Sequence, residues 1–126
     1  MDKTELSASE SLIMKVIWDA DGEISVPEMM KILKDEYGKD YARTTIATFL
    51  LRLSDKRFVT TRRMGKISYV TALKSLEDYR KEIARKNTDF WFKGSALNFI
   101  SALHSTGSLT KEDRKKIQDF LNSLND

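Results

Sequence analysis

The sequence predicts a mainly α fold that contains one small β-hairpin. Three segments with apolar residues at helical spacing come first, two short strands around a glycine follow, and only helical patterns come after them. The turn between the strands is basic. Helix, helix, helix and basic hairpin is the element order of a winged helix-turn-helix. We therefore predict a winged-helix domain over residues 1–73 and a region of three further helices over residues 74–126.

Capping motifs mark the first two helices. Ser7 and Glu10 form a capping-box pattern, and Ser25-Val26-Pro27-Glu28 repeats it, with a proline where a first helical turn tolerates one. Glu23-Ile24 is expected as a short strand, and Gly38 is expected to end the second helix in the left-handed conformation. The predicted buried stripes of these two helices are Leu12, Ile13, Val16, Ile17, Met29, Ile32 and Leu33.

The third helix is expected from about Ala42 to Lys56. Because residues four apart stack on one side of a helix, this segment has an apolar inner face and a polar outer face. The inner face holds Ile46, Phe49, Leu50 and Leu53, and the outer face holds Thr44, Thr45, Thr48 and Arg52. Strands are expected at residues 58–61 and 67–71, with residues 62–66 as the tip of the hairpin.

The last third of the chain carries three apolar helical stripes. A long helix is expected to begin near Ser75 and to be broken by Gly94-Ser95, a short one spans residues 96–103, and Thr110 caps the last. About fifty residues in three helices bury such stripes poorly on their own. We therefore predict dimerisation through this region, with packing against the winged helix as the alternative. The predicted dimerisation residues are Phe90, Trp91, Phe92, Ile117, Phe120, Leu121 and Leu124.

Composition argues against an enzyme. The 126 residues contain no cysteine and a single histidine, His104, which excludes disulfides and thiolate chemistry. No phosphate-binding or dinucleotide-binding glycine motif occurs, and the set His104, Glu112 and Asp113 is a poor candidate for a metal site. We expect no cofactor and no metal. Residues 1–5 lack the apolar stretch of a signal peptide and no segment resembles a membrane span, so we expect a cytoplasmic protein without membrane insertion.

Charge is distributed unevenly along the chain. Residues 1–39 hold five Lys/Arg against nine Asp/Glu, whereas residues 40–67 hold seven against two. The basic window contains the third helix and the hairpin, a distribution that is typical of a surface that faces phosphates. The alternative is an ordinary solvated face.

The third helix has the composition of a helix that contacts bases. Threonine hydroxyls and methyls can reach base edges and the thymine methyl, so Thr44, Thr45 and Thr48 are candidate base contacts. Arg43 and Arg52, near the two ends of the helix, are candidate phosphate contacts. The remaining predicted DNA-binding residues lie on the hairpin and are Arg62, Arg63 and Lys66.

The sequence resembles the penicillinase and methicillin-resistance repressors of the BlaI/MecI type. The resemblance rests on Ile17-Trp18-Asp19, Ser25-Val26-Pro27-Glu28, Tyr41-Ala42-Arg43-Thr44-Thr45-Ile46-Ala47-Thr48, Leu51-Arg52-Leu53, Gly65-Lys66-Ile67-Ser68-Tyr69 and Ser95-Ala96-Leu97-Asn98-Phe99-Ile100. It implies a homodimeric transcriptional repressor that binds an inverted-repeat operator of TACA/TGTA character on double-stranded DNA and that controls β-lactam resistance or related genes.

The resemblance also implies a switch. Family members are released from DNA when a membrane sensor-protease system triggers cleavage at an Asn–Phe bond, which here corresponds to Asn98–Phe99. Copper-responsive relatives have cysteine-rich tails, so copper sensing is disfavoured. Two departures are notable: Ala47 stands where some members have a basic residue, and Lys56-Arg57-Phe58 replaces the commoner turn that contains glycine.

Two further hypotheses remain open. A winged-helix module could present its basic hairpin to another protein instead of DNA. A ligand-responsive regulator could hold an inducer between Phe90, Trp91 and Phe92. The charge asymmetry favours DNA over a role in protein binding alone.

Overall fold

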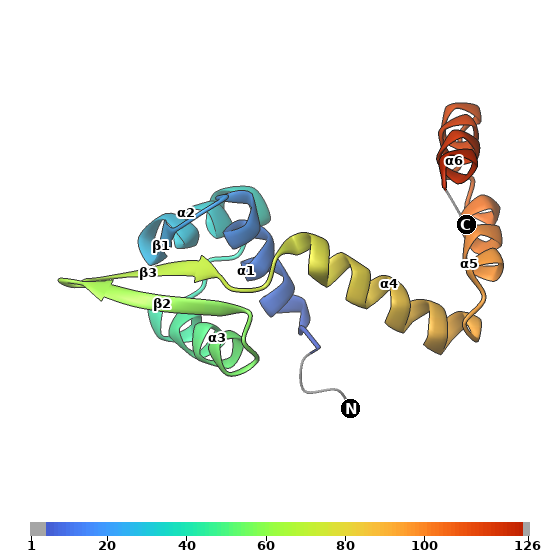
Figure 1. The fold of residues 1–126 in the computed structure, drawn as a ribbon. Coiled ribbons are helices and arrows are strands. Elements are labelled where there is room, and N and C mark those ends of the chain that lie inside the picture. The colour runs from blue at the N-terminus through green and yellow to red at the C-terminus, as the bar shows by residue number, and fades with distance from the viewer. Residues whose placement is uncertain (1–4, 125–126) are drawn as a thin grey trace. The chain divides into compact units, whose positions relative to one another are not determined.

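The computed structural model describes residues 5–124 and forms two compact units, Met1–Tyr79 and Arg80–Asp126. The signal-peptide expectation at residues 1–5 falls almost wholly outside the described residues. Figure 1 shows the elements in chain order: α1 (Ala8–Asp19), β1 (Ile24–Ser25), α2 (Val26–Tyr37), α3 (Arg43–Asp55), β2 (Val59–Met64), β3 (Ile67–Ala72), α4 (Leu76–Phe92), α5 (Ala96–Ser105) and α6 (Lys111–Ser123). The predicted winged helix-turn-helix is confirmed.

Local sequence signals fix the ends of the first two helices. The Ser7 hydroxyl accepts a hydrogen bond from the Glu10 N–H and the Glu10 carboxylate accepts one from the Ser7 N–H, which completes the predicted capping box. At α2 the Ser25 hydroxyl caps the helix by accepting from the Glu28 N–H. Gly38 ends α2 with φ 65°, as expected.

The wing is part of a three-stranded antiparallel sheet with strand order β1-β3-β2. Strand β2 runs through Met64, so Arg62 and Arg63 lie in the strand and not in the tip that the sequence suggested. Pairing continues because Gly65, with φ 64°, occupies the first position of a two-residue turn, where positive φ favours glycine. Figure 1 shows the hairpin extending beyond α2 and α3.

The hydrophobic core lies in the first unit. Trp18 donates from Nε1 to the Lys74 carbonyl at 2.8 Å, and the Tyr79 ring packs 5.4 Å from Trp18 and 5.6 Å from Phe58 between ring centroids. The first turn of α4 therefore belongs to the winged-helix unit. The buried apolar residues are Ile13, Met14, Val16, Ile17, Ile24, Val26, Met29, Leu33, Ile46, Leu50, Leu53, Phe58, Val59 and Val70.

One ion pair is buried at the edge of this core. The Lys56 ammonium lies 2.7 Å from Oε1 of Glu10, whose side chain is 2% exposed, and it also donates to the Glu5 carbonyl. Burial opposes ionisation of Glu10, but the hydrogen bonds from Lys56 and Ser7 outweigh it and hold the pKa of the carboxyl below its usual value. The pair connects the beginning of α1 to the end of α3.

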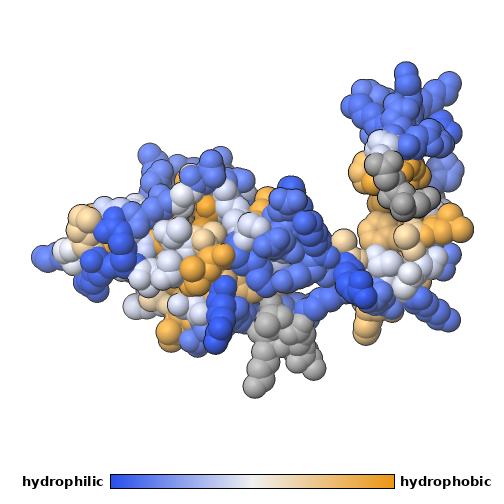
Figure 2. Space-filling model, in the orientation of Figure 1, coloured by the Kyte–Doolittle hydropathy of each residue, from blue (hydrophilic) through white to orange (hydrophobic). Residues whose placement is uncertain are grey.

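The second unit contains α5, α6 and most of α4. Ser95 caps α5, and Thr110 with Asp113 forms a complete capping box at α6. None of the described residues of α4, α5 or α6 is buried, and Figure 2 shows apolar side chains gathered on the surface of this unit. The large apolar residues exposed there are Phe90, Trp91, Leu97, Ile100, Leu103, Phe120, Leu121 and Leu124. No helix within residues 5–124 is long and apolar enough to cross a membrane.

Candidate nucleic-acid interface

Helix α3 presents three faces. Ile46, Leu50 and Leu53 are buried in the core, as predicted from their spacing. An outer face carries Thr44, Thr48 and Arg52, which are all exposed. The third face lies toward the wing and carries the side chains of Arg43, Ala47, Leu51 and Ser54.

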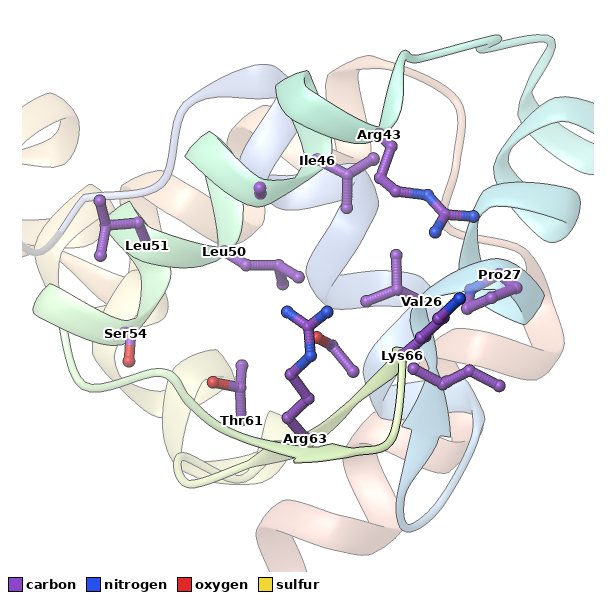
Figure 3. Close-up of a pocket in the computed structure, with 13 residues that line it drawn as sticks. Val26, Pro27, Arg43, Ile46, Leu50, Leu51, Ser54, Thr61, Arg63 and Lys66 are labelled. Carbon is purple, nitrogen blue, oxygen red and sulfur yellow. The ribbon is translucent and has the colours of Figure 1, made fainter.

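A cleft of about 380 Å³ separates this third face from the hairpin. Its apolar lining includes Val26, Ile46 and Leu50. Figure 3 shows Arg43 pointing into the cleft from α3 and Arg63 pointing into it from β2, with Lys66 beside the turn. Among the described residues that line the cleft there is no Asp or Glu. The cleft therefore combines an apolar floor with three cations.

The two adjacent arginines of β2 point to opposite faces of the sheet, as alternation along a strand requires. Arg63 lines the cleft and donates from Nε to the Gly65 carbonyl at 3.1 Å. Arg62 instead pairs with Glu23 at 2.6 Å and lies over the Tyr69 ring, 4.8 Å from its centroid. The hydrogen bond from Arg62 lowers the pKa of Glu23, and the same bond raises the pKa of Arg62.

Most of the predicted DNA-binding residues lie together. Arg43, Arg63 and Lys66 share the cleft, and Thr44, Thr48 and Arg52 share the outer face of α3, where the Thr48 hydroxyl donates to the Thr44 carbonyl. Within residues 5–124 none of the four cations in these two groups forms an ion pair. Thr45 is half-buried and stands one turn before Phe49, and Arg62 lies outside both groups.

Sequence reasoning did not single out three exposed apolar residues of α3 and the wing. Leu51 is 64% exposed on α3, and Met64 and Ile67 face each other in register beside the turn of the wing. The spacing of Arg43, Ala47, Leu51 and Ser54 marks Leu51 as a residue of the wing-facing side of α3. Met64 has no comparable spacing signal, because the sequence predicts residues 62–66 as the tip of the hairpin.

Within the described part of the chain, no three residues of the types His, Cys, Asp and Glu lie close enough to hold a metal ion together. The Glu23–Arg62 pair, in which both pKa values depart from the usual ones, lies on the face of the sheet opposite the cleft.

The sequence profile of the penicillinase repressor family matches residues 6–123. The chain belongs to this family. It is a family of transcriptional repressors and not of enzymes, so the chain is a winged-helix, DNA-binding transcriptional regulator. No curated protein matches the chain.

Three solved structures are similar to the chain. The solution structure of the DNA-binding domain of the repressor BlaI is 29% identical, with a TM-score of 0.51 over 62% of this chain and 92% of that domain. RosR of H. salinarum is 13% identical, with a TM-score of 0.54 over 96% of this chain and 94% of RosR. A complex structure of RosR is 14% identical, with a TM-score of 0.53 over 85% of this chain and 98% of that one. The RosR likeness concerns the fold.

Proposed function

We propose that the chain is a cytoplasmic homodimeric repressor that binds inverted-repeat operator DNA through α3 and the wing. The observation that carries this proposal is the cleft beside α3, where Arg43, Arg63 and Lys66 converge and no described acid lies among the lining residues. A surface of this charge favours a polyanion over an ordinary protein partner.

In the proposed complex, α3 lies in the major groove with its outer face toward the bases. Thr44 and Thr48 offer hydroxyls and methyls of a length that reaches base edges. The DNA strand that borders the major groove passes the cleft, where its phosphates are contacted by Arg43, Arg63 and Lys66. Arg52 contacts the DNA backbone at the other end of α3.

We propose that the second unit forms the dimer. Trp91 is 71% exposed and Phe120 is 61% exposed, and no described residue of α4 to α6 is buried. A solvated surface with this much apolar area is unusual for a monomer, and a second copy of the same face would cover it. Two winged helices held together in this way match an inverted-repeat operator.

Salt dependence of DNA binding tests the proposal. Arg43, Arg52, Arg63 and Lys66 form no ion pair among the described residues. These four cations per protomer would neutralise about eight phosphates per dimer, so log K should fall with log salt at a slope near −7. Fluorescence anisotropy with a labelled duplex from upstream of the protein's own gene measures this slope. DNA binding that does not change with salt concentration would contradict the proposal. It would favour the alternative in which the winged helix binds another protein.

Base recognition has a separate test with a matched control. Thr48→Ala removes an exposed hydroxyl and should change discrimination at one operator position by about 1 kcal/mol. Thr45→Ala removes a half-buried hydroxyl on the same helix and should change discrimination less. A larger effect at Thr45 would mean that α3 is rotated in the groove relative to this proposal.

We propose that cleavage at Asn98–Phe99 by a membrane sensor-protease system releases the operator, and that the regulated genes concern β-lactam resistance. The family membership of the chain supports both the cleavage and the identity of the regulated genes. A ligand-induced release is the second candidate, because Phe90 and Trp91 are exposed with their ring centroids 4.7 Å apart. Intact protein in cells that are fully derepressed would favour the ligand.

A further inference from the structure

The side chain of Arg62 extends across the three-stranded sheet and pairs with an acid at the opposite edge, beside β1. Its Nε donates to Oε2 of Glu23 and its Nη2 donates to Oε1, both at 2.6 Å. Glu23 directly precedes β1, whereas Arg62 lies in β2, and these two strands are separated by β3. The guanidinium spans that distance over the ring of Tyr69, its partner in the β2–β3 register.

This arrangement engages one edge of the guanidinium, its Nε and Nη2. A two-point contact between an arginine and a carboxylate fixes the orientation of the guanidinium plane as well as its position, and the aromatic ring below adds a second restraint. The side chain of Arg62 is 49% exposed, so the pair adds little to global stability. The pair acts instead on geometry, because it restrains the position of the Arg62 side chain relative to Glu23.

The strand that carries Arg62 lies at the edge of the sheet. β2 pairs with β3 alone in the sheet, and a two-stranded ribbon is only marginally stable by itself. Arg63, the next residue, lines the cleft on the opposite face of the same strand. A restraint between β2 and β1 would therefore influence the direction in which Arg63 and Lys66 point.

We propose that Arg62 is a positioning residue that ties the wing to the body of the winged helix through Glu23, and that Arg63 and Lys66 make the phosphate contacts. This proposal rests on the proposed DNA-binding function and refines it. It also assigns a role to Glu23, which lies on the face of the sheet opposite the cleft and lines a hollow together with Asp19, Glu28 and Glu36. If Arg62 moved to a phosphate, the Glu23 carboxylate would be left near the DNA without its donor, which is unfavourable.

Substitution of the acid separates positioning from direct contact. If Arg62 positions the wing, Glu23→Gln should weaken binding of a random-sequence duplex about fivefold, although it removes a negative charge. Arg62→Gln should weaken it by a similar factor, and the double variant should be no weaker than either single variant because both remove the same pair. A direct phosphate contact predicts the opposite sign for Glu23→Gln, since the freed arginine would bind DNA more strongly.

The salt slope supplies a second, independent readout. Arg62→Gln should leave the slope of log K against log salt unchanged, whereas the neighbouring control Arg63→Gln should make it shallower by about 2 per dimer. Arg62→Lys keeps the charge but loses the two-point contact, so it should weaken binding like Arg62→Gln.

Thermal unfolding would establish that each variant is folded at the temperature of the binding measurement. A shallower slope for Arg62→Gln, or tighter binding by Glu23→Gln, would overturn the proposal while leaving DNA binding intact. Salt-insensitive binding by the unaltered protein would overturn the proposed function and this proposal with it.

Discussion

Among residues 5–124, two of the seven basic side chains between residues 40 and 67 form ion pairs with acids that precede residue 40. Lys56 pairs with Glu10 inside the fold, and Arg62 pairs with Glu23 across the sheet. Composition alone cannot separate these cations from those that face a ligand, because pairing depends on which residues the fold brings together. The basic window therefore includes two cations that the fold pairs with acids, and the DNA-binding role of the remaining cations stays a prediction.

The Lys56–Glu10 pair predicts a specific loss of stability. Lys56→Met should lower the free energy of unfolding at pH 7 by about 2 kcal/mol, because the Glu10 carboxylate stays buried without its cation. Lys66→Met removes a lysine that forms no ion pair among the described residues and should change stability little. Urea denaturation of both variants and the unaltered protein measures the difference.

The same pair should respond to pH. The folded-state pKa of Glu10 is lowered, so its contribution is fully present above the usual glutamate pKa and is lost as the pH falls through the lowered value. The stability gap between the unaltered protein and Lys56→Met should therefore narrow in acid. A gap that stays constant from neutral pH to below the lowered pKa of Glu10 would show that the variant acts through packing and not through charge.

At the scale of elements, α2 and α3 are each followed by a residue in the left-handed conformation, although the two residues differ. Gly38 follows α2 with φ 65°, and Arg57 follows α3 with φ 66°. After α3, Phe58 donates its N–H to the Leu53 carbonyl and Arg57 donates to the Ser54 carbonyl, the hydrogen bonds of a Schellman motif. The departure noted at Lys56-Arg57-Phe58 thus places an arginine where the turn favours glycine.

Arg57→Gly should raise the free energy of unfolding by about 1 kcal/mol, because a side chain other than glycine is strained at positive φ. Arg57→Ala removes the charge but keeps the strain, and should leave stability nearly unchanged. Gly38→Ala should lower stability by about the same 1 kcal/mol, although the added Cβ meets no atom within 4 Å. Thermal unfolding measures all three, and equal stabilisation by Gly and Ala at position 57 would point to charge.

Elements with strong local signals could be predicted from the sequence. Ser7, Thr110 and Gly38 begin or end helices as expected, since caps depend on residues three or four positions apart. The bounds of the wing could not be predicted as well, because the extension of β2 to Met64 depends on pairing with β3. The outer face of α3 was predicted in part: Thr44 and Thr48 are exposed, whereas Thr45 is half-buried. Their contacts with bases stay a prediction.

At the scale of the molecule, the boundary between the units lies inside α4. The domain boundary predicted after Leu73 remains a prediction, but the compact unit extends to Tyr79, whose ring contacts Trp18 and Phe58. A chain that ends after Leu73 loses this ring and the Lys74 carbonyl that accepts from Trp18. A chain that ends after Arg85 keeps both and omits the exposed aromatic pair Phe90 and Trp91.

The two shortened chains should differ in stability but not in oligomeric state. The free energy of unfolding of the chain that ends after Arg85 should be about 2 kcal/mol higher than that of the chain that ends after Leu73. Sedimentation should show both as monomers and the full chain as a dimer. Tyr79→Ala in the full chain is the matched point variant, and it should lower stability without dissociating the dimer. A dimer of the Arg85-terminated chain would move the interface into the winged helix.

Cleavage at Asn98–Phe99 should act on the dimer and not on the DNA-contacting surface. The bond lies near the beginning of α5, where the Asn98 N–H donates to the Ser95 hydroxyl and the Phe99 ring packs 5.1 Å from Phe92 between centroids. A protease needs extended backbone, so this turn must open before it can be cut. Cleavage would then separate Phe120 and Leu121 from the winged helix together with all of α6.

A chain that ends at Asn98 reproduces the product of that cleavage. It should be monomeric where the full chain is dimeric, and its operator affinity should fall by at least about a hundredfold, because two linked half-site contacts become separate binding events. Its salt slope per protomer should not change, since Arg43, Arg63 and Lys66 are retained. In the native host, mass spectrometry after a cell-wall antibiotic should detect the fragment of residues 1–98. Tight operator binding by the shortened chain would exclude dimer loss as the means of release.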